Sequence, residues 1–180
     1  MTSGINIPER AALMLASSTG SSPVASALYF CETVTETETL KIEPQARLAW
    51  EGTDTPHGTL SIDLTAASTV DANPDLLQHI FENLFRNATD HNEESVTVTV
   101  GSLTQNPGSD PDPIGFYIED DGNGIPAAVR EQIFEHGYTS NQSGTGIGLS
   151  IVHDFVTAHG WEISATDAYT GGARFEIKTE

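Results

Sequence analysis

The hydrophobic and polar positions of the chain alternate most regularly after residue 58. Residues 59–64 (TLSIDL) and 95–103 (SVTVTVGSL) alternate along their length, which predicts half-buried β-strands. Between them, apolar residues recur at helical spacing from residue 73 to about residue 91. Asn73-Pro74 is a typical helix start, because asparagine caps the helix and proline suits its first turn. These patterns predict a strand, a long amphipathic helix and a second strand.

Similar patterns continue to the end of the chain. Short strands are predicted at residues 68–72, 114–119, 161–165 and 174–178, and helices at residues 126–134 and 148–159. Strands of this kind bury one face, and amphipathic helices can cover that face. The predicted fold class is therefore α/β (α+β), a two-layer sandwich in which helices lie on one face of a mixed β-sheet.

Residues 1–58 give weaker signals. Residues 9–18 favour a short helix that residues 19–23 (TGSSP) would end, while residues 33–40 (TVTETETL) suit an exposed strand or a polar loop equally well. We therefore divide the chain into a poorly defined N-terminal segment, residues 1–58, and a domain formed by residues 59–180.

The composition is strongly acidic. The 180 residues include 26 acidic and 7 basic side chains, so the formal net charge is −19. No basic stripe is present to displace counterions from a phosphate backbone, which argues against nucleic acid as a partner. Salt screens the self-repulsion of so many charges. Acidic residues spread along the whole chain resemble the composition of proteins from salt-accumulating archaea, so we expect a halophilic protein.

Cys31 is the single cysteine, which excludes an internal disulfide framework and a thiolate metal cluster. The chain has no apolar run near the roughly 20 residues needed to cross a bilayer. Its first residues lack the pattern of a secretion signal. These observations predict a cytoplasmic protein with no membrane span in this chain.

Two asparagines, Asn83 and Asn87, are one helical turn apart in the long predicted helix, so their side chains point the same way. Amide oxygens are hard ligands that suit Mg²⁺. An isolated pair is more often merely solvated. Here Leu84 and Phe85 lie between the two asparagines, which places this face at the border of the core and favours a ligand site.

A carboxylate and two glycines follow the strand predicted at residues 114–119. Asp120, at the strand end, can accept a hydrogen bond from an adenine amino group, and Gly122 and Gly124 let the backbone approach a ring. An ordinary Asp-Gly turn is the alternative interpretation.

Three further glycines, Gly144, Gly146 and Gly148, lead into the helix predicted at residues 148–159. Unpaired N–H groups and the positive end of the helix dipole would then face an anion such as a phosphate. The polar residues 137–143 before them suit a mobile lid. The phosphate-loop pattern that ends in Gly-Lys-Ser/Thr is absent.

These motifs, in this order, resemble those of a known family. Asn83–Ala88, Asp120–Ile125, Phe134-Glu135 and Gly144–Leu149 are similar to the asparagine box, the first glycine box, the phenylalanine box and the second glycine box of the histidine-kinase ATP-binding domain. That domain belongs to the superfamily of gyrase, heat-shock chaperone, histidine kinase and MutL ATPases. The resemblance covers about residues 59–180, includes Gly171–Phe175 as the closing strand, and implies a Bergerat-type fold that binds ATP and Mg²⁺.

The resemblance also implies a role for each matched residue. Asn87 would bind Mg²⁺, Asn83 would assist at the metal and the phosphates, and both would serve catalysis. Asp120 would bind the adenine. For His91, an ordinary histidine at a helix end is an equally good interpretation. The residues expected to bind the nucleotide beside Asn83, Asn87 and Asp120 are Arg86, His91, Gly122, Gly124, Gly144, Thr145, Gly146, Gly148 and Leu149.

One position distinguishes the branches of this superfamily. The hydrolases carry a water-activating glutamate four residues before the metal-binding asparagine, and Asn83 occupies that position here. Glu82 is adjacent, but one residue along a helix turns the side chain by roughly 100°, away from the site. The resemblance therefore implies phosphoryl transfer rather than hydrolysis.

The phosphate acceptor is missing from the expected place. None of the six histidines lies on a helix before the ATP-binding domain, and His153-Asp154 falls on the helix after the second glycine box. We therefore expect the catalytic domain of a two-component histidine kinase, with the phosphoacceptor hairpin and the response-regulator receiver domain in other chains. In this interpretation residues 1–58 are the remnant of a dimerisation and phosphoacceptor hairpin. The alternatives are a degenerate ATP-binding regulatory module and a protein serine kinase of the anti-sigma type.

Overall fold

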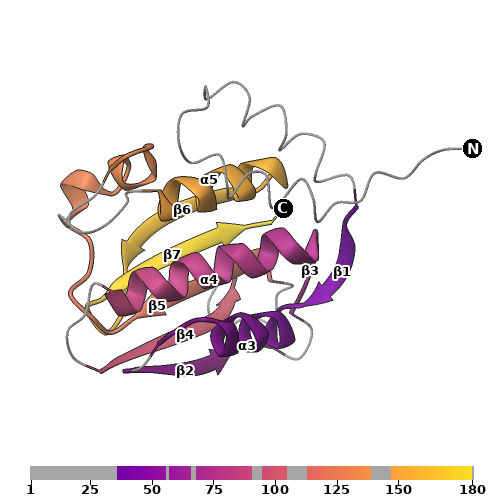
Figure 1. The fold of residues 1–180 in the computed structure, drawn as a ribbon, viewed down its shortest axis with the longest axis horizontal. Coiled ribbons are helices and arrows are strands. Elements are labelled where there is room, and N and C mark those ends of the chain that lie inside the picture. Colours follow the sequence, from indigo (N-terminus) through magenta and orange to yellow (C-terminus); the bar gives the residue numbers. More distant parts are fainter. Residues whose placement is uncertain are drawn as a thin grey trace, which may run out of the picture. The chain divides into compact units, whose positions relative to one another are not determined.

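A five-stranded mixed sheet forms one layer of the structure, a computed structural model, in the strand order β2-β4-β5-β7-β6 (Figure 1). The pair β2–β4 is parallel and the other pairs are antiparallel. The strands span β2 Gly58–Asp63, β4 Val96–Leu103, β5 Gly115–Asp120, β6 Glu162–Asp167 and β7 Ala173–Lys178. This arrangement confirms the predicted α/β sandwich built on a mixed sheet.

Among the described residues, three helices cover one face of this sheet: α3 (Ile42–Gly52), α4 (Pro74–Asp90) and α5 (Gly148–Ala158) (Figure 1). Helix α4 lies between the other two and packs against both of them (Figure 1). Its apolar face is wholly buried, as the helical spacing of its hydrophobic residues predicted. None of the helices among the described residues is long and apolar enough to cross a membrane.

The core lies between α4 and the three central strands. Phe81 of α4 packs on Phe116 of β5 with ring centroids 5.6 Å apart, and it stacks on Phe85 at the same distance. The inward residues of β4 are the alternating valines of the sequence, which are almost completely buried. Aromatic and β-branched side chains therefore fix how α4 lies on the sheet.

The structured domain begins earlier than the sequence indicated. The compact unit that contains the sheet runs from Glu36 to Glu180, whereas we expected a boundary at residue 58. Strand β1 (Glu38–Lys41) pairs with β3 (Thr69–Ala72) in a separate two-stranded sheet. Trp50 of α3 meets Phe85 of α4 edge to face at 5.1 Å. These contacts make residues 38–52 part of the domain.

The structure describes residues 36–55, 57–65, 68–90, 95–104, 113–138 and 147–179. The helix expected at residues 9–18 and most of the expected lid lie outside this part. That the N-terminal segment is a remnant of a phosphoacceptor hairpin stays a prediction. The helix expected at residues 126–134 is instead two short 3-10 helices, Ala127–Val129 and Gln132–Phe134, a form typical of such short segments.

Candidate nucleotide-binding site

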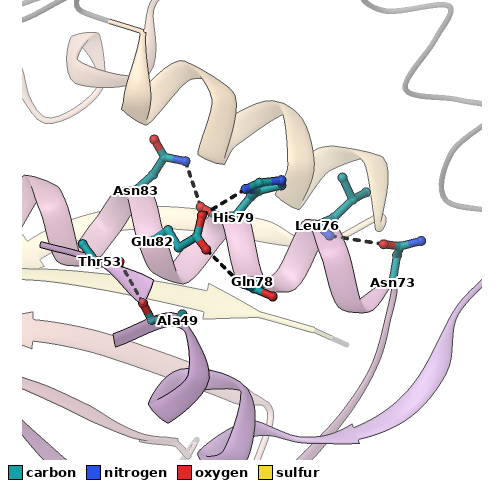
Figure 2. Close-up of polar contacts among 8 residues, drawn as sticks. All are labelled: Ala49, Thr53, Asn73, Leu76, Gln78, His79, Glu82 and Asn83. Carbon is teal, nitrogen blue, oxygen red and sulfur yellow. Dashed lines mark hydrogen bonds and ion pairs between the residues drawn. The ribbon is translucent and has the colours of Figure 1, made fainter. Parts of the chain in front are cut away.

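Helix α4 begins where the sequence predicted and thereby positions both asparagines. The side chain of Asn73 caps it, because Asn73 Oδ1 accepts the backbone N–H groups of Asp75 (3.1 Å) and Leu76 (3.2 Å), as Figure 2 shows for Leu76. Burial of the apolar face then fixes the rotation of the helix. As a result Asn83 and Asn87, one turn apart, are both half-buried.

Asn83 lies where α4 meets the start of α5. Its Nδ2 donates to the backbone oxygen of His79 at 2.8 Å (Figure 2). Its Oδ1 would lie only 3.2 Å from a Cβ added to Gly148, the first residue of α5. The missing side chain of Gly148 therefore permits the close approach of the two elements that carry the asparagine box and the second glycine box.

Glu82 is turned to another side of α4. Its carboxylate accepts a hydrogen bond from Gln78 Nε2 at 2.8 Å and lies 3.2 Å from His79 Nδ1 (Figure 2). A Cβ added to Gly52, at the end of α3, would lie 3.9 Å from Glu82 Oε1. Glu82 therefore faces its own helix and α3, whereas Asn83 faces α5.

Asp120 is the last residue of β5 and is only 6% exposed. Its Oδ1 accepts the backbone N–H groups of Gly122 (2.9 Å) and Ala173 (3.3 Å). Burial raises the pKa of this carboxyl, and the two N–H groups oppose that rise. Among the described residues Oδ2 has no hydrogen-bond partner, so this carboxyl keeps one acceptor for a ligand.

The loop after Asp120 contacts two other segments, β4 and the β6–β7 turn. The Asp121 carboxylate accepts the backbone N–H of Thr97 in β4 at 2.7 Å. Gly124 has φ +70, a conformation that favours glycine, and a Cβ there would lie 3.0 Å from the carbonyl oxygen of Gly171. The first glycine box is therefore held between β4 and the β6–β7 turn.

Asp121, Gly171 and Ala173 take part in these contacts but were not among the predicted site residues. The sequence offered Gly171–Phe175 only as a closing-strand signature. Ala173 is 53 residues from Asp120, so no local pattern indicates their hydrogen bond.

Helix α5 begins at Gly148, and Ile147 caps it without a side-chain hydrogen bond from any described residue. Its first N–H groups and the positive end of its dipole are thus available to an anion. Leu149 is half-buried and Arg86 is exposed on α4. His91, Gly144, Thr145 and Gly146 lie outside the described residues, and their roles stay predictions.

The metal ligands expected here are few. Within the described part of the chain, no group of three or more His, Cys, Asp or Glu side chains is placed to hold an ion. The hard amide oxygen of Asn87 suits Mg²⁺, which commonly takes one or two protein oxygens and completes its shell with phosphate and water. The donor set therefore fits a nucleotide-bound ion.

A groove of about 710 Å³ lies away from these residues, beside β6. It is lined by the two 3-10 helices, His153 and Ile163, and it contains none of the residues predicted to bind nucleotide. We place the candidate site at Asp120, Asn83 and Gly148 because of their chemistry and contacts, not because of a hollow in the surface.

Comparison with known families settles the class of this domain. Residues 72–180 match the family model of the histidine kinase-, DNA gyrase B- and HSP90-like ATPases. The chain belongs to this family. Similar curated proteins include the sensor histidine kinases ZraS of Escherichia coli O157:H7, 32% identical over 108 residues, and CpxA of Escherichia coli K12, 34% identical over 112 residues. The matched regions cover 60% and 58% of this chain.

The matches span only 22% of ZraS and 23% of CpxA, so the chain is homologous to the catalytic domain of these kinases alone. Among solved structures, the mycobacterial sensor histidine kinase MprB has a TM-score of 0.65 at 23% identity, covering 79% of this chain and 95% of that one. Full-length ShkA in complex with AMPPNP has a TM-score of 0.63 at 23% identity, covering 80% and 31%. At this identity the likeness shows the fold, which is that of histidine kinase ATP-binding domains.

Proposed function

We propose that this domain binds ATP with Mg²⁺ and transfers the γ-phosphoryl group to a histidine of another chain. The observation that carries the proposal is the buried Asp120 carboxyl, with Oδ1 held by Gly122 and Ala173 and Oδ2 left as an acceptor. An adenine amino group is a donor that fits this oxygen. The kinase relatives, and the AMPPNP bound by the fold neighbour ShkA, support the same ligand class.

In the proposed complex the adenine lies on Asp120 and Gly124, and the phosphates extend toward Asn83, Asn87 and the start of α5. Mg²⁺, when bound, neutralises charge that develops on the phosphates. Asn87 holds that ion, and the N-terminal N–H groups of α5 bind phosphate oxygens. The bond between the γ-phosphorus and the ADP oxygen breaks as a bond to an imidazole nitrogen of the acceptor forms.

The position of Glu82 supports transfer over hydrolysis. A water-activating carboxylate must lie within hydrogen-bond reach of the attacking water. Glu82 instead bonds to Gln78 and His79 of its own helix. Removing its charge by Glu82→Gln should therefore leave phosphoryl transfer unchanged.

The acceptor belongs to another chain in this proposal. His153 is 48% exposed in its side chain and lies 3.9 Å from Asp154, but it is part of α5, the helix that frames the nucleotide site. A histidine fixed to the domain that holds ATP cannot be carried to the γ-phosphate by domain movement. We propose a histidine-bearing hairpin as acceptor and a receiver domain as the next phosphate carrier.

The test is ATP binding by calorimetry at molar salt, which screens the net charge of −19. Wild type should bind Mg²⁺-ATP, Asp120→Ala should bind far more weakly, and His153→Gln, an exposed control, should bind as wild type does. No binding by folded wild type contradicts the proposal.

Transfer of labelled γ-phosphate to a separately supplied histidine hairpin tests the second step. Binding without transfer to any hairpin or receiver indicates a regulatory ATP-binding module. Acid-stable label on a protein serine, in place of acid-labile phosphohistidine, indicates a serine kinase.

A further inference from the structure

We propose that Gly172, in the turn between β6 and β7, is a positioning residue for base recognition, because it lets the main chain close on Asp120. This inference rests on the proposed function, since it concerns how the same carboxyl selects adenine. Gly172 itself touches neither nucleotide nor phosphate acceptor in the proposal. It acts through Asp120.

The steric evidence is a main-chain contact. A Cβ added to Gly172 would lie 2.0 Å from the backbone oxygen of Asp120, 2.5 Å from its carbonyl carbon and 2.6 Å from its Oδ1. Non-bonded heavy atoms rest about 3.5 Å apart, so relief requires a movement on the order of 1 Å. Because the nearest atoms belong to the backbone, no side-chain rotation can supply it.

The hydrogen bonds explain why this closeness matters. Ala173, the next residue, donates its N–H to Asp120 Oδ1 at 3.3 Å, near the limit of a hydrogen bond. Gly122 donates to the same oxygen from the other side. With Oδ1 occupied, only Oδ2 is left to meet the base. A retreat of β7 would break the bond from Ala173 and release the carboxyl from this orientation.

The turn is held in place by its own contacts, so it cannot shift freely. Ala168 donates its N–H to the Gly172 oxygen at 2.8 Å, and Gly171 donates its N–H to the Ala168 oxygen at 3.0 Å. On the far side, Gly124 passes so near Gly171 that a Cβ would lie 3.0 Å from the Gly171 oxygen. The turn is thus fixed between the strand end at Asp120 and the glycine loop that follows it.

Gly172→Ala is the test, read as the ratio of ATP affinity to inosine triphosphate affinity. Inosine replaces the amino donor with a carbonyl, so wild type should prefer ATP by about 10- to 100-fold, the usual value of a hydrogen bond to a charged group. Gly172→Ala should reduce the preference to a few-fold. Gly52→Ala is the matched control, because its Cβ meets only Glu82 at an ordinary 3.9 Å, and it should keep the full preference.

A double-mutant cycle separates positioning from general destabilisation. If Gly172 acts through Asp120, adding Gly172→Ala to Asp120→Ala should change ATP affinity little further. If Gly172→Ala does not fold, as judged by a cooperative melt, Ala173→Pro removes the same N–H at the first residue of a strand, where proline is tolerated, and should also lower the ratio.

A folded Gly172→Ala or Ala173→Pro variant that keeps the wild-type preference overturns the inference while the proposed function stands. Wild type that binds neither nucleotide overturns the proposed function itself.

Discussion

The two sides of the candidate site are built in different ways. The proposed adenine side consists of Asp120, the glycine loop after it and the β6–β7 turn, and it is held by contacts between segments far apart in sequence. The phosphate side consists of Asn83 and Asn87 on α4 and the start of α5. There the Asn83 amide bonds to its own helix, through the oxygen of His79.

This difference indicates which side is rigid. On the adenine side the acceptor cannot move unless a strand moves, so its geometry exists before a nucleotide arrives. On the phosphate side a side-chain amide can exchange a bond within its helix for a metal or a phosphate by a change of rotamer. The proposed site therefore combines a fixed base side with an adjustable phosphate side.

The largest loss of phosphoryl transfer is nonetheless expected on the phosphate side, at the proposed metal ligand Asn87. Asn87→Ala should reduce phosphoryl transfer by about 100-fold or more, since even groups behind a metal ligand are typically worth about 10- to 100-fold. Binding of ATP without Mg²⁺ should change little. Asn87→Asp keeps an oxygen ligand and is the control. Steady-state transfer measured against Mg²⁺ concentration checks this, and loss of metal-free ATP binding would contradict it.

Asp120→Asn is the next largest change and tests the adenine side. The amide can keep Oδ1 for Gly122 and Ala173, but it places a donor where the adenine donor must bind. We expect ATP affinity to fall by about 10- to 100-fold in calorimetry.

The stability of this variant should move in the opposite direction. Burial raises the pKa of Asp120 above its ordinary value of 3.8. Protonated Asp120 therefore stabilises the folded domain fully below pH 3.8, and this stabilisation is lost as pH rises through the raised pKa. At pH 7 Asp120→Asn should therefore unfold at an equal or higher denaturant concentration than wild type. A less stable variant at pH 7 that recovers in acid would contradict this sign.

The elements that carry Asn83, Asn87 and Asp120 were the ones that the sequence predicted best. Helix α4 has a capping asparagine, a first-turn proline and an unbroken apolar face, and β5 ends at the carboxylate. Each signal is local. Helix α3 was missed because Lys41, the last residue of β1, provides no side-chain cap, and because only Ile42, Ala46 and Ala49 are buried, which makes a weak apolar stripe.

The contacts that complete the site could not be predicted from local sequence patterns. The bond from Ala173 to Asp120 and the approach of Gly148 to Asn83 join segments that meet only once the sheet and helices have packed. The glycines were visible in the sequence. The sequence does not show which atom each glycine allows to come close.

Gly148→Ala, on the phosphate side, should have a smaller effect. Its Cβ would lie 3.2 Å from Asn83 Oδ1, the end of a side chain that can give way, whereas the Cβ at Gly172 meets backbone. We expect ATP affinity to fall only a few-fold. Thermal stability should hold or rise, since alanine in place of glycine favours a helix by about 0.5–1 kcal/mol. Affinity and melting of this variant beside Gly172→Ala measure the difference, and equal losses from both would refute the distinction between the two sides.

The smallest effect concerns how α4 and α5 are held together. His159, at the end of α5, places Nδ1 2.7 Å from the Phe155 oxygen and accepts the Asn73 N–H at Nε2 (3.1 Å). A carbonyl only accepts and a backbone N–H only donates, so the ring must be neutral. It stacks on Trp161 with centroids 4.3 Å apart, and burial lowers its pKa below the ordinary 6.5.

As pH falls, His159 is protonated in the unfolded chain before it is protonated in the folded domain, because its folded-state pKa is lowered. The stability that neutral His159 contributes is therefore complete above pH 6.5 and is lost as pH falls through the lowered pKa. The loss is at most about 1.4 kcal/mol per pH unit. Unfolding in denaturant at pH 7.5, 6.5 and 5.5 should show a shallower acid decline for His159→Gln than for wild type, while exposed His153→Gln keeps the wild-type slope. Equal slopes in all three proteins would show that α4 and α5 are joined without this neutral histidine, and that the helix pair behind the phosphate side depends on packing alone.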